Sequence, residues 1–346
     1  MEKIIYVVDK KNSALYTAAS SRIALSGGTM LIANEYISPR HLLKDIHKEG
    51  GGIVLFCWRK VLGDIISLNR SLKIYKEFDD NFTFAFLIPD HMGLETKFEN
   101  IEAKMINASE YYVVTSKLLF DLYSEKYPTK PPKTIYHDLP NLKLVEDVRK
   151  DFQKSKSQKT RIIWVGNSRW GQRQGYKDHK GLEKYVRPLK EHCEKYLNNL
   201  TVEIIDSSVN SLNQLETLRR IRDSDILIQV SKSEGTGIVI LEAIGLETRV
   251  LTTKVGIAEE FFSIDDYQIL KDKSVQGILT NIGNLMNSTS TEALRRKFDE
   301  YVENARNENL ISVYKSREFV KSNFSLLNFT VYGFWFYRFI SNKLSR

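Results

Sequence analysis

Apolar and polar positions alternate in the first half of the chain with the pattern of a doubly wound sheet. Short, nearly continuous apolar runs occur at residues 4–9, 29–33, 53–58, 82–88, 111–115 and 134–137. Segments with helical spacing separate them, most clearly residues 15–25, 94–107 and 116–127. Strands that are apolar on both faces and joined by helices indicate a parallel sheet covered on both sides. We therefore predict a Rossmann-like domain over residues 1–150.

The second half repeats this alternation after the polar, lysine-rich run 150–159, which predicts a linker. Strands are expected at 162–165, 202–206, 226–230 and 250–253, and helices at 181–197, 211–222 and 238–244. Two longer helical patterns follow at 275–286 and 291–320. The fold class is thus α/β, with a second Rossmann-like domain over residues 161–320 and an aromatic-rich segment over 321–346.

The loop before the predicted helix 238–244 carries the clearest chemical signal. Gly235 and Gly237 allow a ligand to approach the backbone closely, and the unpaired amides at the start of the helix attract a diphosphate. Carboxylates such as Glu234 and Glu242 accept hydrogen bonds from the hydroxyls of a sugar and a ribose. Glycine-containing loops also precede helices in many other α/β proteins, and helical glutamates are commonly solvated. The residues alone therefore leave a nucleotide ligand and an ordinary loop as alternatives.

Residues 233–243 resemble the Glu-x7-Glu signature of retaining family-4 glycosyltransferases, which have the GT-B fold. The resemblance implies two Rossmann-like domains that face a cleft, with a C-terminal helix that crosses back to the first domain. It implies that Glu234 contacts the donor sugar, that Glu242 contacts the nucleotide ribose, and that the amides of Gly235, Thr236 and Gly237 bind the diphosphate. The expected donor is a nucleoside-diphosphate sugar, used as a co-substrate without any other cofactor.

An upstream segment resembles the part of this family that neutralises the diphosphate. Gly166 ends a predicted strand, Arg169 follows it, and Lys180 precedes Gly181. Cations there stabilise the departing nucleotide, so we expect transfer without a metal ion. The insertion 170–179 leaves two candidates for the arginine, Arg169 and Arg173, and a solvated basic loop is the alternative interpretation.

The first domain offers a histidine at the end of a predicted strand. His91 follows the run 82–88, where doubly wound folds place ligands. The segment resembles the family's histidine-containing loop, which implies that His91 contacts the donor sugar or an acceptor hydroxyl. A turn histidine without a role is the alternative.

Two departures from the family pattern support a second class of function. Glu247 and Arg249 stand where the family has glycine and proline, and the loop 10–14 lacks the usual glycine pair. A catalytically degenerate protein that binds a nucleotide or a glycan is therefore the alternative to a hexosyltransferase. A dinucleotide oxidoreductase is disfavoured, because no Gly-x-Gly-x-x-Gly follows the first strand of either half.

Charge and the ends of the chain bear on partners and location. The net charge of +8 favours anionic partners, but no nucleic-acid-binding motif accompanies it. The N-terminus lacks the layout of a signal peptide, and no run has the ~20 apolar residues of a membrane span. We expect a cytoplasmic enzyme acting on a saccharide or lipid-linked glycan acceptor in cell-surface polysaccharide synthesis. The aromatic segment 324–339 is expected to pack on the first domain, and peripheral contact with the inner membrane face is the second interpretation.

Overall fold

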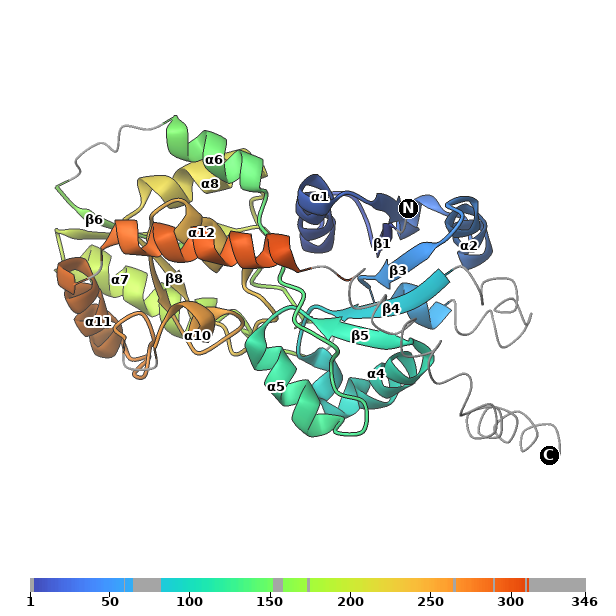
Figure 1. The fold of residues 1–346 in the computed structure, drawn as a ribbon. Helices are drawn as coiled ribbons and strands as arrows, with labels where there is room; N and C mark the ends of the chain where they lie inside the picture. The colour runs from blue at the N-terminus through green and yellow to red at the C-terminus, as the bar shows by residue number, and fades with distance from the viewer. Residues whose placement is uncertain are drawn as a thin grey trace.

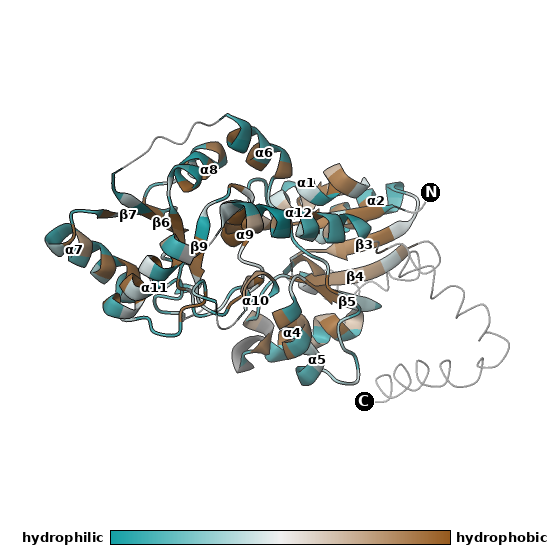
Figure 2. Cartoon of the chain, turned by 60° about the vertical axis from the view of Figure 1, so that its left-hand side comes forward, coloured by the Kyte–Doolittle hydropathy of each residue, from teal (hydrophilic) through white to brown (hydrophobic). Residues whose placement is uncertain are grey.

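Two parallel β-sheets, one in each half of the chain, organise the protein (Figure 1). The computed structural model describes residues 3–58, 60–64, 82–151, 158–172, 175–263, 266–288, 290–308 and 310. Strands β3 and β4 and helix α9 are among the most apolar elements in Figure 2, in keeping with their burial in the two cores.

The first sheet has the strand order β2-β1-β3-β4-β5, and its strands are parallel. Its strands are β1 (Ile4–Val8), β2 (Thr29–Ile32), β3 (Gly52–Phe56), β4 (Phe82–Ile88) and β5 (Tyr111–Val114). The helices are α1 (Ala14–Ser26), η1 (Ala33–Glu35), α2 (Pro39–Lys48), η3 (Met92–Leu94), α4 (Thr96–Ala108) and α5 (Lys117–Lys126). Because side chains alternate along a strand, one face of the sheet packs on α2, α4 and α5 and the other on α1.

The second sheet has the strand order β7-β6-β8-β9 and is also parallel. Its strands are β6 (Thr160–Gly166), β7 (Leu200–Asp206), β8 (Ile226–Gln229) and β9 (Arg249–Thr252). The helices are α6 (Leu142–Lys150), the π-helical turn η5 (Leu182–Val186), α7 (Arg187–Tyr196), α8 (Gln214–Asp223), α9 (Ile238–Gly245), α10 (Ala258–Phe261), α11 (Val275–Ser288) and α12 (Thr291–Asn307). One face packs on α6, α8, α9 and α12, and the other on η5, α7 and α11. The predicted pair of doubly wound sheets is confirmed.

Three of the expected elements differ from the structure. Residues 134–137 were predicted as a strand, but only an isolated bridge joins Ile135 to Val114. The chain leaves the sheet there to cross into the second half. The predicted helix 181–197 begins as the π-helical turn η5, which continues directly into α7, and Pro188 is the second residue of α7. The predicted helix 291–320 ends at Asn307, because Glu308 takes an extended conformation.

The crossing between the halves uses two segments of the chain. Helix α6 packs on α8 and α9 of the second core, although the predicted boundary at residue 150 assigned it to the first domain. The described chain then returns after α12, where Leu310 is buried in the core around β1 and β3. The domain bounds 1–150, 161–320 and 321–346 stay predictions. The segment 321–346, with the predicted crossing helix and membrane contact, lies outside the described residues.

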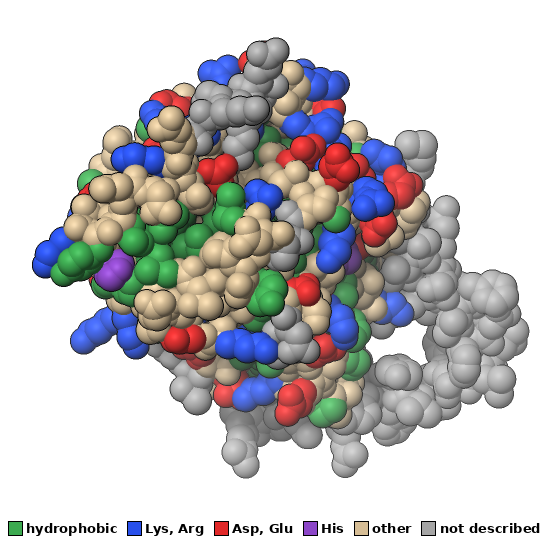
Figure 3. Space-filling view, turned by 90° about the vertical axis from the view of Figure 1, so that its left-hand side faces the viewer, with side chains coloured by type: hydrophobic (Ala, Val, Ile, Leu, Met, Phe, Trp, Pro, Cys, Tyr) green, Lys and Arg blue, Asp and Glu red, His purple; other side chains and the backbone are tan. Residues whose placement is uncertain are grey.

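The surface of the second half carries charges of both signs. On the face shown in Figure 3, Lys and Arg side chains are interspersed with Asp and Glu rather than gathered in one basic field. In the described part of the chain, no helix is both long and apolar enough to cross a membrane.

Candidate functional site

The loop that joins β8 to α9, residues 231–237 (hereafter loop 231–237), lies at the carboxyl end of a parallel strand. Gly237 has a left-handed conformation (φ 80°) immediately before α9, which a residue without Cβ adopts at little cost. The amides of Gly235, Thr236 and Gly237 donate no hydrogen bond to any described residue. Three unpaired N–H groups at the start of a helix provide a site for an anion.

Glu234 is held in this loop by three donors. Its Oε1 accepts hydrogen bonds from Lys180 Nζ at 2.5 Å, Ser231 Oγ at 2.6 Å and Gln229 Nε2 at 2.7 Å. Burial raises the pKa of the carboxyl, but the charge and hydrogen bond of Lys180 and the hydrogen bond of Ser231 outweigh burial, and the pKa is lowered. Glu234 is therefore ionised at neutral pH. The same Lys180 Nζ lies 5.4 Å from the centre of the Trp170 ring, over its face.

Glu242, on α9, is a carboxyl group of a different kind. Its side chain is buried, and Gln214 Nε2 donates a hydrogen bond to it at 3.2 Å. Burial raises its pKa to about 7, with only a small opposing effect from Gln214. Near neutral pH this group both donates and accepts hydrogen bonds, which suits a hydroxyl-bearing ligand.

His91 meets loop 231–237 from the first domain. Its Nε2 lies 2.6 Å from Ser233 Oγ, and its ring stacks on His179 with 5.5 Å between ring centres. The Trp170 ring centre lies 4.5 Å from that of His179. The insertion 170–179 therefore contributes aromatic side chains beside His91, which the spacing of motifs in the sequence did not predict.

The remaining predicted residues are less closely connected to Glu234. Gly166 ends β6, where a Cβ would come within 2.8 Å of the Trp164 ring. Arg169 is exposed, and no ion pair joins its side chain to another described residue. Arg173 lies outside the described residues, so the choice between the two arginines stays open. Within the described ranges, no cluster of three or more His, Cys, Asp or Glu side chains is arranged to hold a metal ion.

Residues of the first domain also contact loop 231–237, and the sequence analysis did not assign them to the site. Ser116 Oγ donates to the carbonyl oxygen of Gly235 at 2.9 Å, and Thr236 Oγ1 donates to Asp138 Oδ2 at 2.8 Å. A Cβ on Gly235 would lie 1.6 Å from the carbonyl oxygen of Pro89. The two domains are thus closed directly on this loop.

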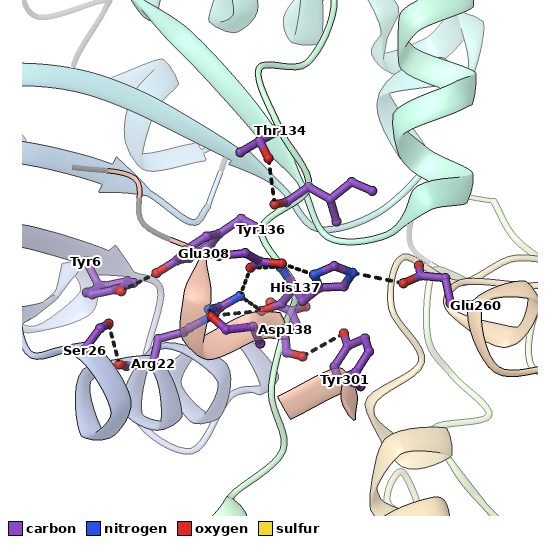
Figure 4. Close-up of polar contacts among 12 residues, drawn as sticks. Tyr6, Arg22, Ser26, Thr134, Tyr136, His137, Asp138, Glu260, Tyr301 and Glu308 are labelled. Atoms are coloured by element: carbon purple, nitrogen blue, oxygen red, sulfur yellow. Dashed lines mark hydrogen bonds and ion pairs between the residues drawn. The ribbon is translucent and has the colours of Figure 1, made fainter. Parts of the chain in front are cut away.

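A buried ionic cluster beside the loop joins the two halves (Figure 4). His137 lies between Glu260, whose Oε2 is 2.9 Å from Nε2, and Glu308, which faces Nδ1. The Arg22 guanidinium contacts Glu308 and the carbonyl oxygens of Ala305 and His137. These contacts connect α1, the segment between α5 and α6, α10 and the end of α12.

Comparison with known proteins agrees with this fold. The profile of the family described as glycosyl transferases group 1 matches residues 128–311. Sucrose-phosphate synthase from Thermosynechococcus elongatus has a TM-score of 0.58 and 13% identity, over 94% of this chain and 100% of that one. The structure of Anabaena HepE in complex with UDP has a TM-score of 0.56 and 12% identity, over 92% and 100% of the two chains. The trehalose 6-phosphate synthase of Burkholderia multivorans has a TM-score of 0.61 and 8% identity, over 92% and 98%. No curated relative matched the sequence.

The two Rossmann-like halves and the family match define a glycosyltransferase of the GT-B type. The family match covers more than half of the chain, and the chain belongs to the glycosyl transferases group 1 family. The predicted GT-B fold and the assignment to glycosyltransferases are confirmed. The assignment to family 4 and the individual site residues stay predictions.

Proposed function

We propose that the protein is a retaining glycosyltransferase that moves a hexose-type sugar from a nucleoside-diphosphate sugar to a saccharide or lipid-linked glycan. The observation that carries this proposal is the pairing of ionised Glu234 with Lys180 beside the unpaired amides of loop 231–237. Such a donor requires a carboxylate to bind the sugar hydroxyls. It also requires a cation and the amides at a helix start to bind the diphosphate.

The chemistry follows from where charge develops. As the bond between the sugar and the diphosphate breaks, negative charge grows on the leaving nucleotide, and Lys180 and the loop amides stabilise it. Side-chain cations, Lys180 with Arg169 or Arg173, then replace a metal ion. Glu242 accepts hydrogen bonds from the ribose hydroxyls, and His91 binds a hydroxyl of the donor sugar or the acceptor. Closure of the two domains aligns the substrates and excludes water.

The wider context of the reaction is part of the same proposal. Retention of anomeric configuration rests on the Glu-x7-Glu resemblance, and the UDP bound to Anabaena HepE supports a nucleotide in this fold. We place the enzyme in cell-surface polysaccharide synthesis in the cytoplasm, with peripheral membrane contact as an additional feature.

The experiment measures donor cleavage and transfer with UDP-, ADP- and GDP-sugars, and the anomeric configuration of the product by NMR. Glu234→Ala and Lys180→Ala are expected to abolish transfer. Because either change leaves a buried charge without its partner, the neutral double variant Glu234→Gln with Lys180→Met guards against loss of folding. Lys190→Ala is the control, since Lys190 forms an exposed pair with Glu194 on the surface of α7. Near-normal transfer by folded Glu234 and Lys180 variants would refute the assignment.

A non-catalytic GT-B protein that binds a nucleotide or a glycan is the second candidate. Glu247 and Arg249, at the positions where the family has glycine and proline, favour it. Tight nucleotide binding without cleavage or transfer in any donor and acceptor combination would support this candidate over the first.

A further inference from the structure

Loop 231–237 is held from two sides, and each side fixes a different peptide group. The carbonyl oxygen of Thr236 accepts the amide hydrogen of Ile257 at 3.0 Å, a contact within the second domain. The carbonyl oxygen of Gly235 accepts the hydroxyl hydrogen of Ser116 at 2.9 Å, a contact from the first domain. Both Ser116 and Gly235 are buried, so water does not compete for this bond.

Each carbonyl determines the direction of the next amide. In a trans peptide, the C=O of one residue and the N–H of the next point in opposite directions within one plane. The described chain contains no cis peptide bond. Ser116 therefore directs the Thr236 N–H away from the first domain, while Ile257 directs the Gly237 N–H away from the start of α10. Neither amide donates to a described residue, which leaves both for a ligand.

The hydroxyl of Ser116 has one proton, and the local structure decides where it goes. Ser116 is the N-cap of α5, where its Oγ accepts the amide hydrogen of Leu119 at 3.3 Å. Acceptance from the helix leaves the proton to be donated to Gly235. Thr236 Oγ1, bound to Asp138, holds the same peptide group from its other end.

We propose that Ser116 is a positioning residue that orients the Thr236 amide toward the donor diphosphate from across the domain boundary. This inference rests on the proposed nucleotide-sugar donor. The second domain alone then determines the direction of the Gly237 amide. The direction of the Thr236 amide is determined only when the first domain is closed on the loop. Ser116 itself does not touch the donor. Its effect is therefore confined to the diphosphate and does not extend to the nucleoside.

The test compares Ser116→Ala with a matched loss of another helix cap. Ser290 caps α12 through the amide of Ala293, so Ser290→Ala removes a cap without altering loop 231–237. Ser116→Thr keeps both the cap and the donated proton. Calorimetry of each variant with UDP, ADP and GDP, and with uridine, adenosine and guanosine, gives the dissociation constants.

Ser116→Ala is expected to weaken diphosphate binding several-fold, up to about tenfold, because loss of the roughly 1 kcal/mol hydrogen bond to Gly235 lets the Thr236 amide turn away from the diphosphate. The affinity of Ser116→Ala for nucleosides is expected to stay close to wild type. The affinities of Ser116→Thr and Ser290→Ala for diphosphates are expected to stay close to wild type as well. Equal diphosphate affinity in wild type and Ser116→Ala would overturn the inference and leave the proposed function intact. The inference would also be overturned if Ser116→Ala weakened the binding of nucleosides as much as that of diphosphates. The same holds if Ser290→Ala weakened diphosphate binding as much as Ser116→Ala does. Failure of wild type to bind any of the three diphosphates would overturn the proposed function, and this inference with it.

Discussion

His137 should make the stability of the protein depend on pH in one defined window. Both ring nitrogens face carboxylates, Nε2 toward Glu260 and Nδ1 toward Glu308, so both must carry hydrogen and the ring is an imidazolium. Burial opposes this charge, but the hydrogen bonds and charges of the two glutamates outweigh burial and raise the pKa to about 9. The perturbation to make is His137→Gln, which removes the charge.

The magnitude follows from the difference between the folded and unfolded states. A rise from the ordinary value of 6.5 to about 9 corresponds to about 3 kcal/mol, at roughly 1.4 kcal/mol per unit of pKa. Because the folded pKa is the higher one, this contribution is complete below about pH 6.5 and is lost as pH rises through 9. Asp138, whose pKa burial raises to about 6, titrates below this window.

The assay is urea unfolding of wild type and His137→Gln at pH 6 and at pH 9.5. The difference in free energy of unfolding should be about 3 kcal/mol at pH 6 and should shrink at pH 9.5. Titrations of groups that do not interact with His137, Glu242 among them, cancel in this difference. Ser290→Ala, at the exposed start of α12, removes no ionisable group and is the control, whose difference from wild type should be the same at both pH values. A difference that is constant or grows with pH would refute the ionic assignment.

Two further substitutions test the backbone at either end of α9. Gly235→Ala should hold the domains apart, because its Cβ would lie 1.6 Å from Pro89 O. Small-angle scattering should then report a larger radius of gyration. Gly283→Ala, whose Cβ would lie in open space, should leave the radius of gyration unchanged. An unaltered radius in the Gly235 variant would show that the loop yields instead. Glu247→Gly should stabilise the protein by up to about 1 kcal/mol, because Glu247 has a left-handed backbone (φ 60°), and thermal unfolding that shows a loss would contradict this. Asn12→Gly, at the same φ in a residue that tolerates it, should gain less.

The sequence predicted most of the strands and the position of the glycine-containing loop before α9, because both patterns are local. Continuous apolar runs determined the two parallel sheets, and Gly235, Gly237 and the flanking glutamates marked the start of α9. The partners of this loop in the first domain lie more than a hundred residues away in sequence, as Ser116 does from Gly235. No local pattern distinguishes the serine that contacts the loop from any other helix cap. The left-handed Glu247 also explains why a glycine is usual there and why this departure concerns the backbone.

The contacts between the two domains divide into two kinds with different consequences for motion. Around His137, largely buried charges form three ion pairs, His137 with Glu260, His137 with Glu308, and Arg22 with Glu308. Breaking one of these pairs leaves a largely buried charge with fewer partners. On loop 231–237, the bonds of His91, Ser116 and Asp138 go to hydroxyl or carbonyl groups, each worth on the order of 1 kcal/mol. The summed free energy of these hydrogen bonds is small enough for a bound ligand to shift the equilibrium between closed and open domains. Separation of the domains at the loop, with the ionic cluster intact, is therefore the less costly motion, and it opens the loop to which we assign the donor diphosphate.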